Sequence, residues 1–348
     1  MGVLILATMN ILDQSPITHG SDAATALKQT VELAKIVDRL SFKRFWVSEH
    51  HNSTSLAGSA PEILVSTLAA NTQRIRIGSG GVMLPHYSAY KVAESFRVLE
   101  GLYGGRIDLG IGHGFGGSPL STNALRESKV VPSYAEQIDD LQVYLTDSVP
   151  ASHRFPGLVA SPSVRTVPEM WLLGLSVGSA ELAAAKGISF TYGYAMTSTP
   201  TTDILALYRD SFKPSQIHRR PQYSLAISVV CADTEPEAED LARAVELYMV
   251  WTVTGKRRFG LPTVSMAQDY QYSQAEFEAR DRLRKGMIVG DPQSVKDQIQ
   301  SLRDLYQVDE FVCLSNITHF EARVRNFELL SQIASEMGNY VESKSAVR

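Results

Sequence analysis

One stretch of the sequence decides the fold: RIRIGSGGVMLPHYSAYKVAESFRVLEGLYGGRIDLGIGHG, residues 74–114. It begins with an apolar run of strand length, 75–80, and ends with a second one, 107–112. Between the two runs, apolar residues recur every three or four positions from 92 to 103, the spacing of one helix face. A strand, a helix and a second strand in this order are typical of a parallel βαβ unit.

The same alternation continues in both directions from this unit. Apolar runs of strand length are separated by segments of helical period almost from end to end. The expected strands cover residues 3–11, 44–48, 75–80, 107–112, 167–173, 188–194, 223–232 and 310–314. Eight such strands with interleaved helices predict an α/β fold, the closed (β/α)8 or TIM-type barrel.

Two segments interrupt the alternation, at about 147–166 and 255–286. Both are long and lack a clear period, so we expect loop insertions at the face formed by the carboxyl ends of the strands. The second segment follows the seventh strand and would fold over that face. The rest of the pattern predicts one barrel domain over residues 1–340 and a tail at 341–348.

Composition and charge exclude several classes of function. The chain has 348 residues, 44% of them hydrophobic and 20% charged, which suffices for a large buried core. With 33 basic and 37 acidic residues the net charge is −4, so we expect no nucleic-acid partner. No apolar run reaches the roughly 18 residues that span a bilayer, and residues 3–9 lack the features of a leader. Cys231 and Cys313 lie in apolar runs, so we expect two buried thiols in a cytoplasmic protein.

In a barrel of this class the active site lies at the carboxyl ends of the strands. Glu49, His50 and His51 come directly after the second expected strand. Histidine exchanges protons near neutral pH, so these residues are candidates for acid–base catalysis, although they could equally brace the loop. A metal-dependent hydrolase would need a third ligand, for which His86 is a candidate. The spacing matches no metal motif, and we expect no metal.

Three further strand ends are rich in glycine and hydroxyl groups. Residues 78–85 and 110–118 match no nucleotide-binding fingerprint, and no clear helix begins directly after the second of them. Glycine there permits either the close approach of a flat ligand or an ordinary tight turn. Residues 174–179 lead into a helix, where free amides and the helix dipole favour an anion. Ser176 or Ser179 could instead be an ordinary N-cap, but the neighbouring glycine loop favours a phosphate.

Seven short motifs, each weak alone, occur in an order and spacing that resemble the bacterial luciferase-like flavin monooxygenase family, in its single-chain oxidoreductase group. They are LDQSP at 12–16, EHH at 49–51, SAPE at 59–62, GSGGVMLP at 78–85, GGRIDLG at 104–110, PEMWLLG at 168–174 and IVGDP at 288–292. The resemblance covers nearly the whole chain.

The resemblance implies a barrel that binds FMN, with the reduced form supplied by a separate flavin reductase. The implied cofactor-binding residues are Gln14, Ser15, Gly80, Gly81, Val82, Met83, His113, Gly174, Ser176, Val177, Gly178 and Ser179. A non-prolyl cis peptide is implied near Gly80 and Gly81. His50 matches the histidine implicated in flavin–oxygen chemistry, with His51 and Glu49 in support.

The reaction implied by the family is the oxidation of a small organic substrate with O2 through a flavin hydroperoxide. Such an intermediate survives only without water, which gives residues 255–286 a role as a lid. The family also implies a homodimer that forms through helices near the second and third units. Two alternatives stay open: a flavin-binding barrel without turnover, and a deazaflavin-dependent oxidoreductase of the same fold.

One residue departs from the family pattern. Where relatives usually place an arginine near the FMN phosphate, this chain has His113. An imidazole offers at most two donors and is only partly charged near neutral pH, whereas a guanidinium is always charged. We therefore expect phosphate binding to be weaker, pH-dependent, or supported by other groups such as Arg126 or Arg165.

Overall fold

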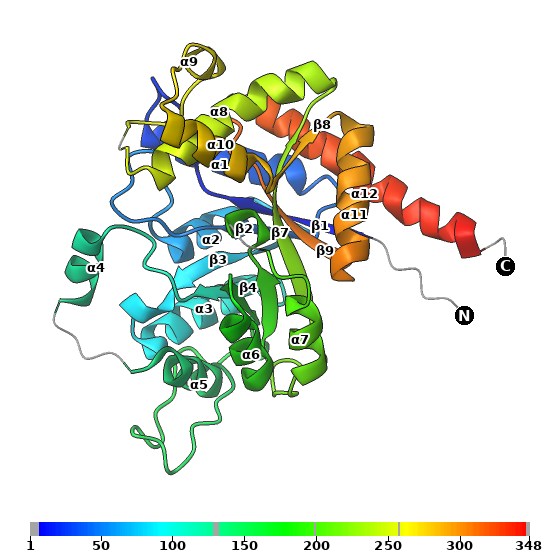
Figure 1. Ribbon diagram of the computed structural model, residues 1–348. Coiled ribbons are helices and arrows are strands. Elements are labelled where there is room, and N and C mark those ends of the chain that lie inside the picture. Colours follow the sequence, from blue (N-terminus) through cyan, green and yellow to red (C-terminus); the bar gives the residue numbers. More distant parts are fainter. Residues whose placement is uncertain (1–6, 128–131, 198–199, 257, 346–348) are drawn as a thin grey trace.

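The computed structural model describes residues 7–127, 132–197, 200–256 and 258–345. Its centre is a ring of eight parallel strands with helices around it (Figure 1). The ring consists of β1 (Thr8–Asp13), β2 (Arg44–Val47), β3 (Arg76–Met83), β4 (Ile107–Gly112), β5 (Glu169–Gly174), β6 (Ser189–Tyr192), β7 (Tyr223–Cys231) and β9 (Glu310–Leu314). Pairing of β6 with β7, β7 with β9, and β9 with β1 closes it. The predicted (β/α)8 barrel is confirmed.

Some strands differ from the predicted ones. β8 (Met287–Gly290) is a ninth strand, which pairs with residues 228–231 of β7. It was not predicted from the sequence, because its apolar pattern did not distinguish it from the insertion that precedes it. The first strand begins at Thr8, and the part of the predicted strand before residue 7 lies outside the described residues. β3 continues to Met83 because its pairing with β4 resumes at Val82 and Met83 after an irregularity at Gly80 and Gly81.

Helices follow the strands on the outside of the ring. They are α1 (Ala23–Val37), α2 (Pro61–Ala70), α3 (Ala89–Tyr103), α4 (Pro119–Arg126), α5 (Tyr134–Leu145), α6 (Val177–Lys186), α7 (Ile204–Ser211), α8 (Glu235–Val253), α9 (Val264–Gln268), α10 (Gln274–Arg284), α11 (Pro292–Tyr306) and α12 (Phe320–Ser345), with short 3-10 turns η1 (Leu84–His86) and η2 (Tyr194–Met196). Several of these helices begin at a side-chain N-cap. The side chains of Asp22, Thr234 and Asp291 each accept a hydrogen bond from the amide three residues further along the chain.

The helix α4 corrects the expectation that no helix begins directly after the glycine loop of residues 110–118. Ser118 caps it and Pro119 occupies its first position, so the start signals were present. None of its side chains is buried. Because the helix presents no apolar stripe to the core, hydrophobic periodicity did not reveal it.

The two long segments pack against different parts of the barrel. Residues 255–286 follow α8 and contain α9 and α10, rather than being structureless. The amide of Leu261 donates to the carbonyl of Ile17 (2.6 Å) and the amide of Gly260 to that of Thr54 (3.0 Å), which fixes this segment against the loops after β1 and β2. Residues 147–166 instead join the end of α5 to the start of β5. This segment packs along α3, where Arg97 pairs with Asp147 (2.7 Å) and donates to the carbonyl of Pro162 (2.7 Å), and the Tyr90 hydroxyl donates to the carbonyl of Val159 (3.2 Å).

The interior of the ring is filled in layers. At the amino end, Arg44 forms ion pairs with Asp108, Glu169 and Glu310. Above them, Trp46 and Trp171 pack edge to face, with 5.3 Å between ring centroids. A larger apolar core lies between the ring and its helices. Within the described part of the chain, no helix has both the length and the apolarity needed to cross a membrane.

Candidate active site

The strand register brings the predicted site residues to one arc of the carboxyl rim. β1 pairs with β2 through Asp13 and Val47, so Gln14 and Ser15 follow beside Ser48 and Glu49. Farther along the arc, Met83 pairs with Gly112, and Gly112 pairs with Leu173. His113 and Gly174 therefore leave neighbouring strands at the same level. The predicted residues come from the ends of five consecutive strands, β1 to β5.

Glu49 organises the part of this arc formed by β2 and β3. Its carboxylate is buried and accepts hydrogen bonds from His51 Nε2 (2.6 Å), the Tyr87 hydroxyl (2.8 Å) and the Met83 amide (3.0 Å). Burial, and secondly the charge of Glu49, raises the pKa of Tyr87, which keeps this phenol a donor. Three donors around one carboxylate hold the His51 ring in one orientation.

His50 is held differently from His51. Its Nδ1 lies 3.0 Å from Ser48 Oγ and its amide donates to the carbonyl of Gly58 (2.8 Å). Burial, and secondly repulsion from His51, lowers the pKa of His50 to about 4. The ring is therefore neutral at neutral pH. With Nδ1 facing Ser48, Nε2 is the atom that can donate or accept a proton.

His86 lies close to this group but has a structural partner. Its Nε2 donates to the carbonyl of Phe115 (2.9 Å), because a carbonyl can only accept, and its ring packs edge to face on His51, with 5.9 Å between the centroids. A neutral His86 then leaves Nδ1 as a buried acceptor without a partner in the described chain. Among residues 7–127, 132–197, 200–256 and 258–345, no three His, Cys, Asp or Glu side chains are arranged to hold a metal.

The peptide between Gly80 and Gly81 is cis, as the resemblance implied. The β3–β4 register shifts at this point, between Ser79 and Val82. A Cβ on Gly80 would lie 2.7 Å from Leu12 Cδ1, and one on Gly81 would lie 2.8 Å from the Gly110 carbonyl oxygen. Contact with the barrel's own strands therefore requires glycine at both positions, whatever ligand lies above them.

The end of β5 leads directly into the N-terminus of α6. Ser176 Oγ caps this helix by accepting from the Ser179 amide (3.3 Å), and it also lies 3.0 Å from Ser179 Oγ. A Cβ on Gly174 would lie 2.3 Å from Ser179 Cβ, so glycine is required for the helix to begin this close to the strand. A Cβ on Gly178 would meet nothing within 4 Å, and no acidic residue stands in the first turn. The terminus is thus open and has the donor set that suits an anion.

His113 is exposed at the end of β4 and stacks on Tyr134 of α5, with 4.5 Å between the centroids. Of the two arginines considered in its place, Arg126 lies at the end of α4 with its guanidinium over the Phe115 ring (5.5 Å). Arg165 precedes β5 and thus lies at the opposite end of the strand from Ser176, which excludes it from a phosphate site at α6. No described cation is seen in contact with the hydroxyls of Ser176 or Ser179.

Three other predicted cofactor residues have structural partners. Ser15 is fully buried, and its hydroxyl accepts from Thr30 Oγ1 (2.9 Å). Val82 belongs to the apolar core outside the ring. Gln14 Oε1 accepts from Asn316 Nδ2 (2.7 Å), which ties the rim ends of β1 and β9 together. Of these, Gln14 alone has a side chain that is not largely buried.

A cavity of about 370 Å³ opens beside His50 and His51. Its other walls come from residues 52–56 and 116–118 and from six described residues within the range 248–258. The last range includes the end of α8 and the start of the insertion, so the segment expected to act as a lid does border the space above the histidines. Sequence patterns did not indicate that Tyr248 and Trp251 of α8 also border it, because α8 and the β2 loop are about two hundred residues apart.

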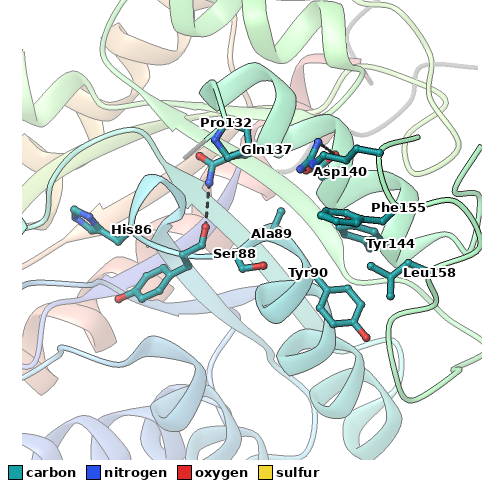
Figure 2. A pocket seen from close by; sticks show the side chains of 12 residues that line it. His86, Ser88, Ala89, Tyr90, Pro132, Gln137, Asp140, Tyr144, Phe155 and Leu158 are labelled. Carbon is teal, nitrogen blue, oxygen red and sulfur yellow. Dashed lines mark hydrogen bonds and ion pairs between the residues drawn. The ribbon is translucent and has the colours of Figure 1, made fainter. Parts of the chain in front are cut away.

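A larger cavity, of about 480 Å³, lies between α3 and α5 (Figure 2). Gln137 closes one side of it by donating to the backbone carbonyl of Tyr87 (3.0 Å). Tyr90, Tyr144 and Phe155 contribute aromatic walls. None of the predicted cofactor or catalytic residues lines it, so the rim cavity is the better candidate for the active site.

Comparison with known proteins identifies the family of this chain. A family model described as luciferase-like monooxygenase matches residues 8–307. The chain belongs to this family. It is 44% identical to Bacillus subtilis protein YwcH, over 94% of this chain and 99% of the relative. It is 38% identical to the N-acetyl-S-alkylcysteine monooxygenase of the same organism, over 93% and 97%. The solved structure of apo-MsnO8 has 33% identity and a TM-score of 0.85, over 96% and 99% of the two chains.

More distant structures share the fold alone. The oxygenating constituent of 3,6-diketocamphane monooxygenase from Pseudomonas putida, in complex with FMN, has 18% identity and a TM-score of 0.68, over 95% of this chain and 98% of that one. An F420-dependent secondary alcohol dehydrogenase has 12% identity and a TM-score of 0.67, over 94% and 98%. The same barrel therefore accommodates both FMN and a deazaflavin.

Proposed function

We propose that this protein is an FMN-dependent monooxygenase that uses reduced flavin and O2 to oxidise a small organic substrate. One observation carries the proposal: the neutral His50, beside the Glu49–His51 pair, borders a cavity on the same rim arc as the open N-terminus of α6. Family membership supplies the reaction class. The arc supplies a place for a phosphate and a proton-handling group near a substrate space.

The residues present on the arc fit FMN. Ser176, Ser179 and the first amides of α6 would hold the phosphate, since they are all donors and no acidic residue stands in that turn. The ring system would lie along the ends of β1, β3 and β4. The residues that would flank it there are Gln14, Gly80, Gly81, Met83 and His113. Ser15 and Val82 would contribute through their backbone, because both side chains are buried.

Bound reduced flavin supplies the electrons that activate O2. The protein would bind the flavin and the substrate, orient them and shield them from water. His50 would hold or pass a proton at Nε2, while Glu49 and Tyr87 keep His51 fixed beside it. The segment that carries Gly260 and Leu261 is hydrogen-bonded over the loops after β1 and β2, where it limits the access of water.

We favour FMN over a deazaflavin because a monooxygenase needs a flavin that reacts with O2, whereas a deazaflavin serves hydride transfer. A relative named N-acetyl-S-alkylcysteine monooxygenase makes thioethers of this type the first substrates to test. We further propose that the protein works in the cytoplasm with a separate flavin reductase. A homodimer would form through α2 and α3, whose outer surfaces expose Ile63, Val98 and Leu102.

The test is a single-turnover reaction of the protein with reduced FMN, isotopically labelled O2 and N-acetyl-S-benzylcysteine, alongside a panel of small aldehydes and thioethers. We expect labelled product from at least one member, and a rate reduced about a hundredfold in His50→Ala. FMN and the deazaflavin F420 are titrated separately against the protein. Tight FMN binding without any labelled product would favour the flavin-binding barrel without turnover, and tight binding of F420 alone would favour the deazaflavin enzyme.

A further inference from the structure

The cavity beside His50 has an uneven distribution of charge. Its described lining contains no aspartate or glutamate. Neutral His50 and its neighbour His51 form one side, and Lys256 and Arg258 stand on the side formed by the insertion. In a chain with four more acidic than basic residues, a cavity lined by cations without carboxylates is a local exception.

The two cations differ in how they are used. Lys256 Nζ is committed to Glu276 (2.6 Å) and to the Tyr270 hydroxyl (2.9 Å), and it lowers the pKa of Glu276 to about 2. Arg258 forms no ion pair with a described carboxylate. Its guanidinium instead packs over the Trp251 ring, 5.8 Å from the centroid. Arg258 therefore retains its hydrogen-bond donors for a ligand.

The backbone of Arg258 is held in place over the cavity. Its carbonyl accepts from Thr54 Oγ1 (2.8 Å) and Ser55 Oγ (3.2 Å), and the following Gly260 is bonded to Thr54. Two hydroxyls from the β2 loop thus fix the point from which the guanidinium extends. The cation belongs to a clamped segment, so its position relative to His50 is set by the fold.

Two further polar groups of the lining can also donate. Ser53 Oγ accepts from the amides of Ser55 and Leu56, which leaves its own proton free to donate. Trp251 is 5% exposed, and its indole N–H has no acceptor in the described chain. Leu56 and the Trp251 ring supply apolar wall. Unpaired buried donors are costly, and an acceptor-rich ligand satisfies them.

We propose that this cavity binds the carboxylate of an anionic substrate at Arg258, with Ser53 and Trp251 as further donors, and directs the apolar, oxidisable end of that substrate toward His50. The inference deepens the proposed function and rests on it. It defines the substrate class as a small carboxylic acid with an apolar body, within the 370 Å³ of the cavity. Arg258 is the residue that selects for the charge.

The test compares each acid with its uncharged primary amide. The probes are N-acetyl-S-benzylcysteine, 4-(methylthio)butanoate and hexanoate, each beside its amide, and binding to the full chain is measured by calorimetry with and without FMN. We expect at least one acid to bind about tenfold more tightly than its amide at low salt, with a smaller ratio at high salt. Arg258→Gln should remove the preference, Trp251→Phe should reduce it, and Arg282→Gln, which removes an exposed cation of α10 outside the cavity, should leave it unchanged.

Two results would overturn the proposal: no acid binds better than its amide, including the case in which no probe binds, or the preference survives in Arg258→Gln. Because binding is read without O2, this outcome is separate from the proposed reaction. Acids that bind through Arg258 but yield no labelled product would refute the monooxygenase assignment alone. Neutral substrates that are oxidised equally well by wild type and Arg258→Gln would refute the anionic substrate class alone.

Discussion

The two ends of the barrel interior use buried charge in opposite ways. At the amino end, Arg44 is 1% exposed and contacts the carboxylates of Asp108 (2.7 Å), Glu169 (2.8 Å) and Glu310 (3.0 Å). At the carboxyl end, Glu49 is equally buried, yet its contacts in the described chain are an imidazole, a phenol and an amide.

This difference distinguishes the structural network around Arg44 from the proposed functional group around Glu49. Every charge at the amino end has an opposite charge beside it, and these contacts raise the pKa of Arg44 despite the cost of burying it. At the rim, the carboxylate orients His51 instead of neutralising a guanidinium, while His50 keeps one ring nitrogen away from its Ser48 contact. The ring nitrogen of His50 that does not contact Ser48 is available for proton transfer, which supports the proposed active site at the carboxyl end.

The largest effect is expected at the amino end. Arg44→Met replaces the guanidinium by an apolar side chain and removes one of the two cations that contact Asp108, which is 0% exposed; the other is Arg76 (2.6 Å). Breaking a buried ion pair by removing one partner costs about 3–5 kcal/mol. We expect a loss of this size in the free energy of unfolding, measured by chemical denaturation.

The double variant Arg44→Met/Asp108→Asn is the control for this prediction. It removes the charge that the single variant leaves with Arg76 as its remaining described cation, so it should recover part of the lost stability. Arg76 keeps Glu169 (3.4 Å), and Glu169 and Glu310 can still be hydrated because they are partly exposed. Equal stability of wild type and Arg44→Met would contradict the structural role of the network.

A smaller effect on the free energy of unfolding is expected from His50 at the rim, and this effect depends on pH. The pKa of His50 is about 4 in the folded protein, against an ordinary value of 6.5. Above pH 6.5 the ring is neutral in both states and costs nothing. Between 6.5 and 4 the unfolded chain takes up a proton that the folded chain does not, so the free energy of unfolding falls as the pH falls and levels off below 4. The total is on the order of 1–3 kcal/mol.

His50→Gln isolates this contribution because it removes the titrating group and retains a polar side chain. His218, whose pKa burial also lowers, remains in both proteins and cancels in the comparison. Denaturation of both at pH 7.5 and pH 4.5 should show a smaller loss of stability in His50→Gln on acidification. Parallel losses in the two proteins would mean that His50 is not held neutral.

The fold was predictable because most strands and helices have a recognisable hydrophobic pattern within their own residues. The unit at 74–114 shows this, with its two apolar runs around a segment of helical period. Two of the elements that were not predicted, α4 and β8, lack such a signal: α4 buries no side chain, and β8 has only four residues and directly follows an insertion. Patterns of hydrophobicity report burial, so an element that is exposed or very short leaves little trace.

The site was predictable only where its residues are neighbours in the sequence. Glu49, His50 and His51 could be recognised because they leave one strand together. Tyr87 is 38 residues from Glu49, and the Thr54 hydroxyl that holds the Arg258 carbonyl is 204 residues away from it. These contacts depend on how η1 and the insertion pack against the rim. No local spacing encodes them.

The smallest effect concerns Tyr87, whose hydroxyl is the one phenolic donor to the buried Glu49 in the described chain. Tyr87→Phe keeps the ring and removes one charge-assisted hydrogen bond, which corresponds to about 1–2 kcal/mol. If Tyr87 positions His51 through Glu49, the maximal rate should fall several-fold while KM for the substrate stays nearly constant. Tyr90→Phe is the matched control, since its hydroxyl donates to the carbonyl of Val159 (3.2 Å) away from the rim. A change in KM instead of the rate, or equal effects of the two variants, would show that Tyr87 only packs, and the contrast between a paired and an oriented carboxylate would then rest on His51 alone.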